Sequence, residues 1–178
     1  MALPGKSFSI SDYLRGTWKR QLEWRHFGGS FEHLKTSNTV VSIEDYHDDE
    51  RRPTDRGGGQ SSRYMRWSFG KTTGTLKPYY VMKFIPDSQG TFLEWEFGGH
   101  RCNGQFQPAT SVMMLNFYLK SSSLTYTFRV MDAHTMAICI VEVDGKHTPT
   151  IQYGNMCRVD PALYPAGAAG GGAGGGGT

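Results

Sequence analysis

Two short motifs contain residue types that bind metals or phosphate, but neither has the surroundings that such a site needs. His100 and Cys102 fall on one predicted turn without a second ligand pair, and a surface turn explains them better. Gly70-Lys71-Thr72 resembles the end of a phosphate-binding loop, but Met65 occupies the position of the required first glycine and no helix follows. No Ser or Cys lies in a nucleophile elbow. The sequence therefore gives no support to hydrolytic or redox catalysis, and no metal site or catalytic residue is assigned.

A second set of residues is suited to binding a ligand. These side chains are large, several end in a polar group, and all fall on predicted strands. Ligand pockets are mostly apolar with a few well-placed polar groups, which matches this mixture. The set comprises Met65, Trp67, Tyr79, Trp95, Tyr126 and Tyr153. The residues alone leave two alternatives open: these side chains line a ligand cavity, or they simply fill a small barrel.

Met65 and Trp67 are two positions apart, so they share one face of a predicted strand. A thioether beside an indole suits a flat conjugated ligand, and we expect Trp67→Ala to weaken ligand binding more than it lowers stability. Arg66 points the other way. Arg20 shares a face with Trp18 and is the cation that we expect to meet a ligand carboxylate, because a buried Arg needs an anion.

The elements that position these side chains are strands. Turn sequences recur at short spacing between residues 15 and 160, and the runs between them are rich in β-branched and aromatic residues. A meander of this length without a long helix usually closes on itself, because open edges invite aggregation. The predicted fold class is therefore all-β: an antiparallel up-and-down barrel of about ten strands, lipocalin-like, with a short N-terminal helix. The predicted strands are 14–27, 31–43, 62–69, 76–85, 91–98, 104–108, 111–119, 123–131, 135–143 and 149–159.

The alternation of residue types predicts which faces point inward. Tyr126 and Phe128 share an inner face, whereas the neighbouring Arg129 points outward. Glu94 and Glu96 are expected to face water. The strand at 112–119 is apolar on both faces, which predicts that it is covered on both sides or lies under the tail.

Gly16 and Trp18 at the start of the first strand suggest how one end of the barrel is closed. A bulky Trp can plug the end, and Gly16 lets the entering chain cross close beneath it. Arg158 ends the last strand, and its guanidinium is expected within about 6 Å of the indole centroid, which is cation–π range. Trp18 and Arg158 are therefore the predicted barrel-closure pair.

The composition limits the remaining possibilities. A chain of 178 residues is expected to form one domain, here the barrel at 1–164, followed by a flexible Gly/Ala-rich tail at 165–178. The net charge of +3 is small and scattered, so nucleic acid is not an expected partner. No apolar run reaches the length of a membrane span. Three cysteines without a C-x-x-C spacing favour an intracellular, reducing compartment, cytoplasm or plastid, over secretion. The charged segment 44–61 is predicted to be a mobile loop outside the barrel.

The Trp18 and Arg158 pair resembles the closure of the calycin superfamily, to which lipocalins and fatty-acid-binding proteins belong. Fatty-acid-binding proteins insert two helices after the first strand, whereas here Phe27-Gly28-Gly29-Ser30 turns directly back. The order of segments over residues 10–159 is most similar to that of the S-type phycobiliprotein lyases, which hold a linear tetrapyrrole in a ten-stranded barrel. The similar segments are Gly16 to Trp18, His26, SNTVVSIEDYHDDE, RYMRWS, VMKFIPDSQGTFLEWEFG and TIQYGNMCR.

This resemblance implies a bilin-binding barrel that holds its chromophore non-covalently, with no tightly bound cofactor. It also implies a phycobiliprotein-type acceptor protein, to a cysteine of which a chromophore lyase would deliver the bilin. One stretch departs from the lyase pattern, because the expected Arg positions on the eighth and ninth strands fall on Met136 and Ile138. Whether the chain is an enzyme is therefore left open. The alternatives are a non-catalytic carrier of another hydrophobic ligand and a filled barrel that acts as an interaction module in a larger assembly.

Overall fold

The computed structural model describes residues 9–34, 39–46, 63–71, 77–87, 90–97, 100–146, 148–160 and 162. At positions 69, 71, 77–80, 86–87 and 97 the backbone alone is described. Most of the predicted loop at 44–61, the side chain of Tyr79 and the predicted tail at 165–178 therefore lie outside the described residues. The described part contains no helix that is long and apolar enough to cross a membrane.

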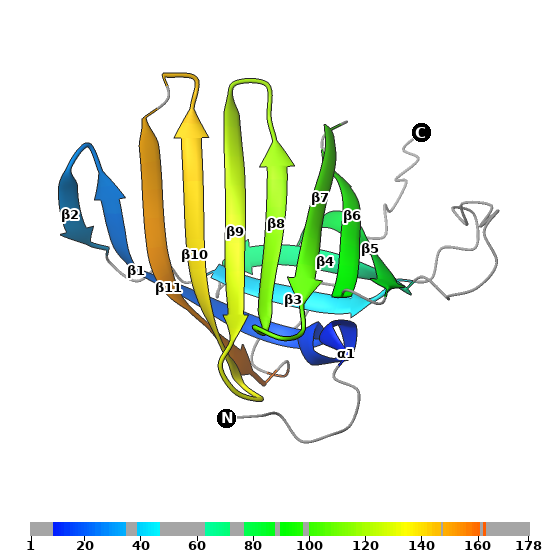
Figure 1. Ribbon diagram of the computed structural model, residues 1–178. Helices are drawn as coiled ribbons and strands as arrows, with labels where there is room; N and C mark the ends of the chain where they lie inside the picture. Colours follow the sequence, from blue (N-terminus) through cyan, green and yellow to red (C-terminus); the bar gives the residue numbers. More distant parts are fainter. Residues whose placement is uncertain are drawn as a thin grey trace, which may run out of the picture.

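One short helix and eleven strands make up the described fold (Figure 1). The helix is α1 (Ile10–Leu14). The strands are β1 (Gly16–Phe27), β2 (Ser30–His33), β3 (Thr39–Asp45), β4 (Arg63–Lys71), β5 (Lys77–Asp87), β6 (Gly90–Phe97), β7 (His100–Gln107), β8 (Val112–Tyr118), β9 (Ser122–Val130), β10 (Thr135–Asp144) and β11 (Pro149–Val159).

Ten of these strands close into an antiparallel barrel. From β3 to β11 each strand pairs with the next in sequence, and β1 joins the two ends because it pairs with both β3 and β11. Short connections between sequential neighbours are what the closely spaced turn sequences predict. The all-β barrel of about ten strands and the short N-terminal helix are therefore confirmed.

One predicted strand is wrong in its extent. The segment expected as a single strand at 31–43 forms two strands, β2 and β3, which pair with different parts of β1. β3 pairs with β1 up to Arg20, and β2 pairs with β1 from Trp24 onward. A β-bulge between Leu22 and Trp24 separates the two regions, so that β2 and the end of β1 form a hairpin beyond the closed part of the sheet.

The turn of this hairpin follows directly from its sequence. Phe27 pairs with Ser30 across a two-residue loop, and Gly28 and Gly29 have φ angles of 56° and 83°. Such a turn needs positive φ at both central positions, which glycine adopts without steric cost. The direct return of the chain that the Gly-Gly pair predicts is confirmed.

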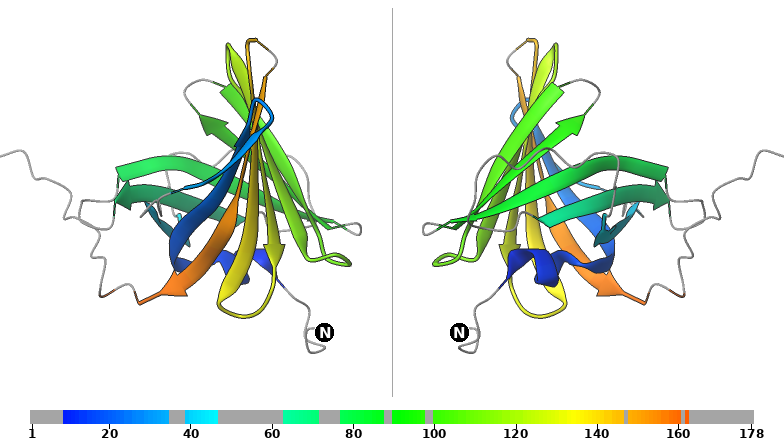
Figure 2. Two further views of the ribbon diagram at one scale, coloured as in Figure 1. Left: turned by 90° about the vertical axis from the view of Figure 1, so that its left-hand side faces the viewer. Right: turned by 90° about the vertical axis from the view of Figure 1, so that its right-hand side faces the viewer.

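Helix α1 lies across one end of the barrel and buries Ile10 and Leu14 in the core (Figure 2). The Ser9 side chain accepts a hydrogen bond from the Asp12 backbone N–H and so caps the helix. Arg63 on β4 binds both Asp12 and Asp45, and its Nη2 lies 2.7 Å from the Asp45 carboxylate. Five residues are too few for a helix to be stable alone, so these contacts and the buried side chains hold it in place.

The outer face of β8 differs from the expectation that it is covered. Leu115 and Phe117 face the core, whereas Met114 and Tyr118 on the opposite face are 46% and 54% exposed. Glu94 and Glu96 on β6 face water as predicted.

Candidate ligand site in the barrel

The end of the barrel next to α1 is closed by Trp18. Its side chain is fully buried, and its indole N–H donates a hydrogen bond to the Leu14 carbonyl at 2.8 Å. The Arg158 guanidinium lies 4.4 Å from the centroid of the indole ring. It also donates hydrogen bonds to the carbonyls of Tyr13 and Arg15, where α1 ends and β1 begins. The predicted closure by Trp18 and Arg158 is confirmed.

Gly16 is required for this closure. Its φ angle is 125°, and a Cβ at this position would lie 2.6 Å from Nη1 of Arg158. An L side chain here would be strained and would also displace the guanidinium. The Gly-x-Trp sequence therefore places the backbone close enough for one arginine to bind both the indole face and the chain that enters the barrel.

The part of the interior next to this closed end is tightly packed. Met65 and Trp67 share the inner face of β4 as predicted, and Trp95 lies on the same inner face two strands along, on β6. All three are buried, with Trp67 only 2% exposed. Substituting a packed Trp by Ala typically costs about 3–5 kcal/mol, so Trp67→Ala is expected to lower stability strongly whether or not a ligand binds. A ligand can touch these three residues only if their neighbours move.

The interior farther from α1 is less densely filled. Tyr126 on β9 faces the interior and stays half-exposed, as does Leu124. The Tyr126 ring packs edge-on against Phe117, at 5.5 Å between centroids, and stacks on Phe128 at 6.0 Å. Phe117 in turn lies 5.1 Å from Trp95. These rings form an aromatic inner wall across β6, β8 and β9, and Tyr126 is the member that retains an accessible face.

Arg20 is an inward-facing arginine one step along β1 from the closed end. It lies on the inner face of β1, two positions from Trp18, and its backbone pairs with Met156 on β11. Its Nη2 donates to the Thr39 hydroxyl at 3.3 Å, and its buried Nε has no hydrogen-bond partner. No carboxylate among the described residues forms an ion pair with it. A half-buried guanidinium with one buried N–H and no anion is unfavourable, so this position is suited to a ligand that brings a negative charge.

Tyr153 does not belong to the interior, and its prediction as a residue that lines the barrel is wrong. Arg158 and Met156 face inward, and the alternation along β11 places Gln152 and Gly154 inside and Tyr153 outside. Tyr153 is 40% exposed and lies opposite Trp24 on the outer surface. Counting in steps of two from Arg158 would have shown this.

The other arginines that the sequence analysis considered as ligand contacts do not face the interior. Arg66 points outward and pairs with Glu44 at 2.7 Å, as the alternation predicts. Arg129 is exposed on the outer face of β9. Met136 and Ile138, at the positions where the resemblance leads one to expect Arg, are buried in the core.

The cysteines and histidines form no reactive centre in the described part of the chain. Cys102, Cys139 and Cys157 are free, and burial raises the pKa of the Cys102 and Cys139 thiols. A thiol with a raised pKa is a poorer nucleophile at neutral pH, because less of it is thiolate. The described residues include no cluster of three or more potential metal ligands.

Comparison with known proteins shows solved structures that share this barrel fold. No protein-family model and no curated protein match the sequence. The structure is similar to that of the S-type phycobiliprotein lyase CPES from Guillardia theta, with a TM-score of 0.58 and 13% sequence identity, over 85% of this chain and 91% of that one. The similarity covers nearly the whole barrel and, at this identity, shows a shared fold.

A second solved structure is also similar. It is a protein of unknown function of the DUF3598 family from Nostoc punctiforme, with a TM-score of 0.51 and 8% identity. The similarity covers 88% of this chain and 54% of that one, so this chain spans about half of the Nostoc protein. The predicted calycin-like fold and the structural similarity to an S-type lyase are confirmed.

Proposed function

We propose that the barrel binds a linear tetrapyrrole, or a similarly elongated, acidic and conjugated ligand, without a covalent bond. The observation that carries this proposal is Arg20. Its guanidinium faces the interior, has no carboxylate partner among the described residues and leaves one N–H unsatisfied. A ligand carboxylate would remove this cost and form a charge-assisted hydrogen bond, which is among the stronger contacts in proteins.

The aromatic inner wall supports the same class of ligand. Tyr126 presents an accessible ring that is backed by Phe117 and Phe128. A conjugated ligand can lie against such a face and gain about 0.5–1.5 kcal/mol per aromatic pair beyond the burial of its apolar area. The predicted ligand residues Arg20 and Tyr126 are therefore the primary contacts in this proposal. Met65, Trp67 and Trp95 form the packed layer behind them.

We propose that the protein holds the ligand, and that delivery to a phycobiliprotein-type acceptor would be a separate activity. On β9 and β10, the single arginine is Arg129, and it points to solvent. Met136 and Ile138 bring only apolar surface to the interior. These strands therefore offer no cation to a transfer step, which favours a carrier over a chromophore lyase. The free cysteines are compatible with the proposed reducing compartment.

A filled barrel that acts as an interaction module is the second candidate function. The burial of Met65, Trp67 and Trp95 favours this candidate. A core packed to this degree leaves no space for a ligand in the part of the interior next to the closed end. The two candidates differ in what they expect at Arg20. A filled barrel needs no anion beside Arg20, whereas a carrier does.

The deciding experiment is a titration of the purified protein with biliverdin, a linear tetrapyrrole that carries propionate groups, followed by its visible spectrum. Binding should shift the spectrum, and Arg20→Met should weaken it about 10–100-fold, which corresponds to the loss of one hydrogen bond between charged groups. Arg129→Met is the matched control, because it removes an arginine from the outer face.

Thermal melts of the same variants separate binding from folding. Arg20→Met removes a half-buried charge with one unsatisfied N–H, so the ligand-free variant should be at least as stable as the wild type. No spectral shift with wild-type protein at tens of micromolar biliverdin, a range in which weak complexes still form, would favour the filled barrel. Equal weakening by Arg20→Met and Arg129→Met would place the ligand outside the barrel.

A further inference from the structure

The hairpin of β1 and β2 ends in a strand edge that the described chain does not cover. β2 pairs with β1 and with no other described strand, and all four of its residues are exposed. The hairpin stands beyond β11 at the left-hand side of the molecule in Figure 1 and faces the viewer in the left view of Figure 2. β2 also lacks the Lys and Pro residues by which many proteins protect such edges.

The backbone groups at this edge follow from the register. Phe27 and Ser30 enclose the two-residue turn and form a hydrogen-bonded pair, so Arg25 and Glu32 form the next one. The hydrogen bond from the Leu34 N–H to the Glu23 carbonyl continues this pattern. The intervening residues of β2 therefore point their N–H and C=O groups away from β1. These residues are Phe31 and His33.

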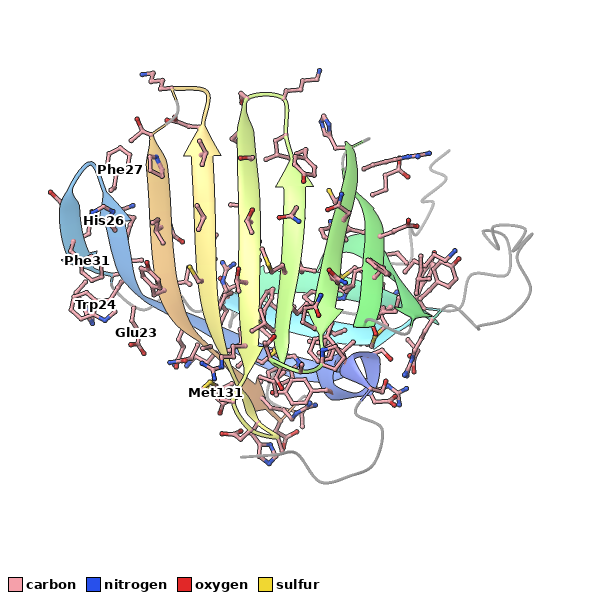
Figure 3. The ribbon with its side chains drawn as sticks, in the orientation of Figure 1. Glu23, Trp24, His26, Phe27, Phe31 and Met131 are labelled. Carbon is pink, nitrogen blue, oxygen red and sulfur yellow. The ribbon has the colours of Figure 1, made fainter. Side chains whose placement is uncertain are left out.

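Aromatic side chains surround the same edge on the outer surface. Trp24 lies 5.4 Å from Phe31 and 4.8 Å from His33 between ring centroids, and Phe31 stacks on Tyr153 at 6.4 Å. Figure 3 shows Trp24 and Phe31 together along the outer side of the hairpin. We call Trp24, Phe31, His33 and Tyr153 the hairpin patch. Its three largest members are 40% to 60% exposed, which is unusual for aromatic residues of a soluble monomer.

We propose that a second copy of this chain covers the β2 edge, with the two β2 strands pairing antiparallel across a two-fold axis. A strand edge with alternating donors and acceptors is complementary to its own copy in this arrangement. The register that places Phe31 opposite the Phe31 of the second copy uses the outward backbone groups of both. It joins the two hairpins into one sheet and aligns the aromatic patches on one face.

Charge complementarity favours this register over its neighbour. With Phe31 opposite Phe31, Glu32 lies beside Ser30 of the second copy, and no like charges meet. A shift that places Phe31 opposite His33 would bring the two Glu32 side chains directly opposite each other, which is destabilising. Arg25 is already paired with Glu32 within each copy, at 3.0 Å, so neither charge needs a partner from outside.

The extent of the shared edge predicts the strength of the dimer. Pairing at the β2 edge brings Phe31 and His33 next to the second copy, whereas Trp24 on β1 and Tyr153 on β11 lie one and two strands away from that edge. The total area buried by two four-residue edges is therefore below about 1,000 Å², at the low end for specific interfaces. The dimer is therefore weak, with a dissociation constant in the micromolar range.

Sedimentation velocity of the full chain from about 5 to 500 μM tests this proposal. The wild type should change from monomer to dimer within this range. Phe31→Ser, which removes an aromatic ring of the patch, should raise the dissociation constant at least tenfold. His33→Pro should do the same, because it removes an outward N–H and leaves the pairing with β1 intact. Phe92→Ser is the matched control, since Phe92 is exposed on the outer face of β6.

Hydrogen exchange supplies a readout that does not depend on a variant folding. On concentration, the amides of Phe31 and His33 should become protected, whereas that of Glu32 is already bonded to β1 and should change little. Either of two results overturns the proposal. The first is a protein that stays monomeric throughout the range, including where it binds lipid vesicles or other proteins through the patch. The second is a dimer that Phe92→Ser weakens and that His33→Pro and Phe31→Ser leave unchanged.

Discussion

Removing the Arg158 guanidinium is expected to open the closed end of the barrel. Arg158→Met keeps the length of the side chain and most of its apolar stem but removes the charge and all hydrogen-bond donors. The lost contacts are the cation–π contact with Trp18 and the two hydrogen bonds to the carbonyls of Tyr13 and Arg15. These contacts join the last strand of the barrel to the first strand and to α1.

The magnitude follows from these contacts. A partly desolvated cation–π contact contributes about 0.5–2 kcal/mol. Hydrogen bonds to a charged donor contribute about 1.5–3 kcal/mol each where they are buried, and less here because the Arg158 guanidinium is only partly buried. Because Met repacks on part of the indole, we expect Arg158→Met to lower the free energy of unfolding by about 2–4 kcal/mol. Arg158→Lys should recover only part of this, since Lys lacks the planar fork that reaches both carbonyls.

Urea unfolding followed by tryptophan fluorescence measures this change in the free energy of unfolding. Arg129→Met is the control on the exposed outer face, and it should change the free energy of unfolding by no more than about 0.5 kcal/mol. A double-mutant cycle with Trp18→Phe then isolates the contact between the two side chains, for which we expect a coupling of about 0.5–2 kcal/mol. If Arg158→Met costs no more than Arg129→Met, the cation–π closure is not what holds this end together.

Two further predictions concern the pH dependence of stability at the same end of the barrel. The hydrogen bond from Arg63 is the main cause that lowers the pKa of Asp12 below its ordinary value of 3.8, so its stabilisation is present above about pH 4 and is lost as the pH falls through the lowered pKa. Asp12→Asn should therefore flatten part of the acid limb of a stability curve, and an unchanged limb would contradict the role of this pair. Burial raises the pKa of Tyr13 to about 12, and its hydroxyl donates to the carbonyls of Asp132 and Thr135. The free energy of unfolding should therefore fall as the pH rises from about 10 to 12. In the wild type, absorbance at the phenolate band should show one tyrosine that titrates near 12, and this titration should be absent in Tyr13→Phe.

The strands and the closure of the barrel could be predicted from the sequence because their signals are local. Turn residues at short spacing fix where strands end, and the alternation within a strand fixes which side chains face the core. Trp18 and Arg158 are far apart in sequence, but each lies at the end of a strand. Closing an antiparallel meander brings those two strands together, as the register between β1 and β11 shows.

The error at Tyr153 came from not following the alternation along the last strand, whereas the split of the predicted strand at 31–43 accompanies a local irregularity in β1. The bulge between Leu22 and Trp24 moves Trp24 to the outer surface, whereas strict alternation from Trp18 and Arg20 would place it inside. No residue type marks this bulge in the sequence, so the aromatic patch of the hairpin could not be predicted. The missing anion beside Arg20 could not be predicted either, because it depends on which side chains the other strands bring close to it.

Gly154 on β11 lies next to the bulge in β1, and substituting it tests whether the close approach of these two strands fixes the position of the hairpin. It lies opposite Leu22, directly before the bulge, and faces the interior. A Cβ at this position would lie 1.9 Å from the Gln21 carbonyl oxygen and 2.7 Å from the Leu22 Cα, and backbone cannot move aside as a side chain can. The bent part of β1 thus approaches β11 so closely that only glycine fits.

Gly154→Ala should therefore separate β1 from β11 at the bulge and lower the free energy of unfolding by about 1–3 kcal/mol, although alanine is elsewhere the more favourable residue. Amide exchange should rise first at Leu22 and Trp24, while the closed end at Trp18 stays protected. Gly145→Ala is the matched control, because it lies in the turn between β10 and β11 and a Cβ there would be 3.2 Å from the Ser121 carbonyl oxygen. If Gly154→Ala is as stable as the wild type, the bulge is flexible enough to accept a side chain, and the position of the hairpin is not fixed by this close approach.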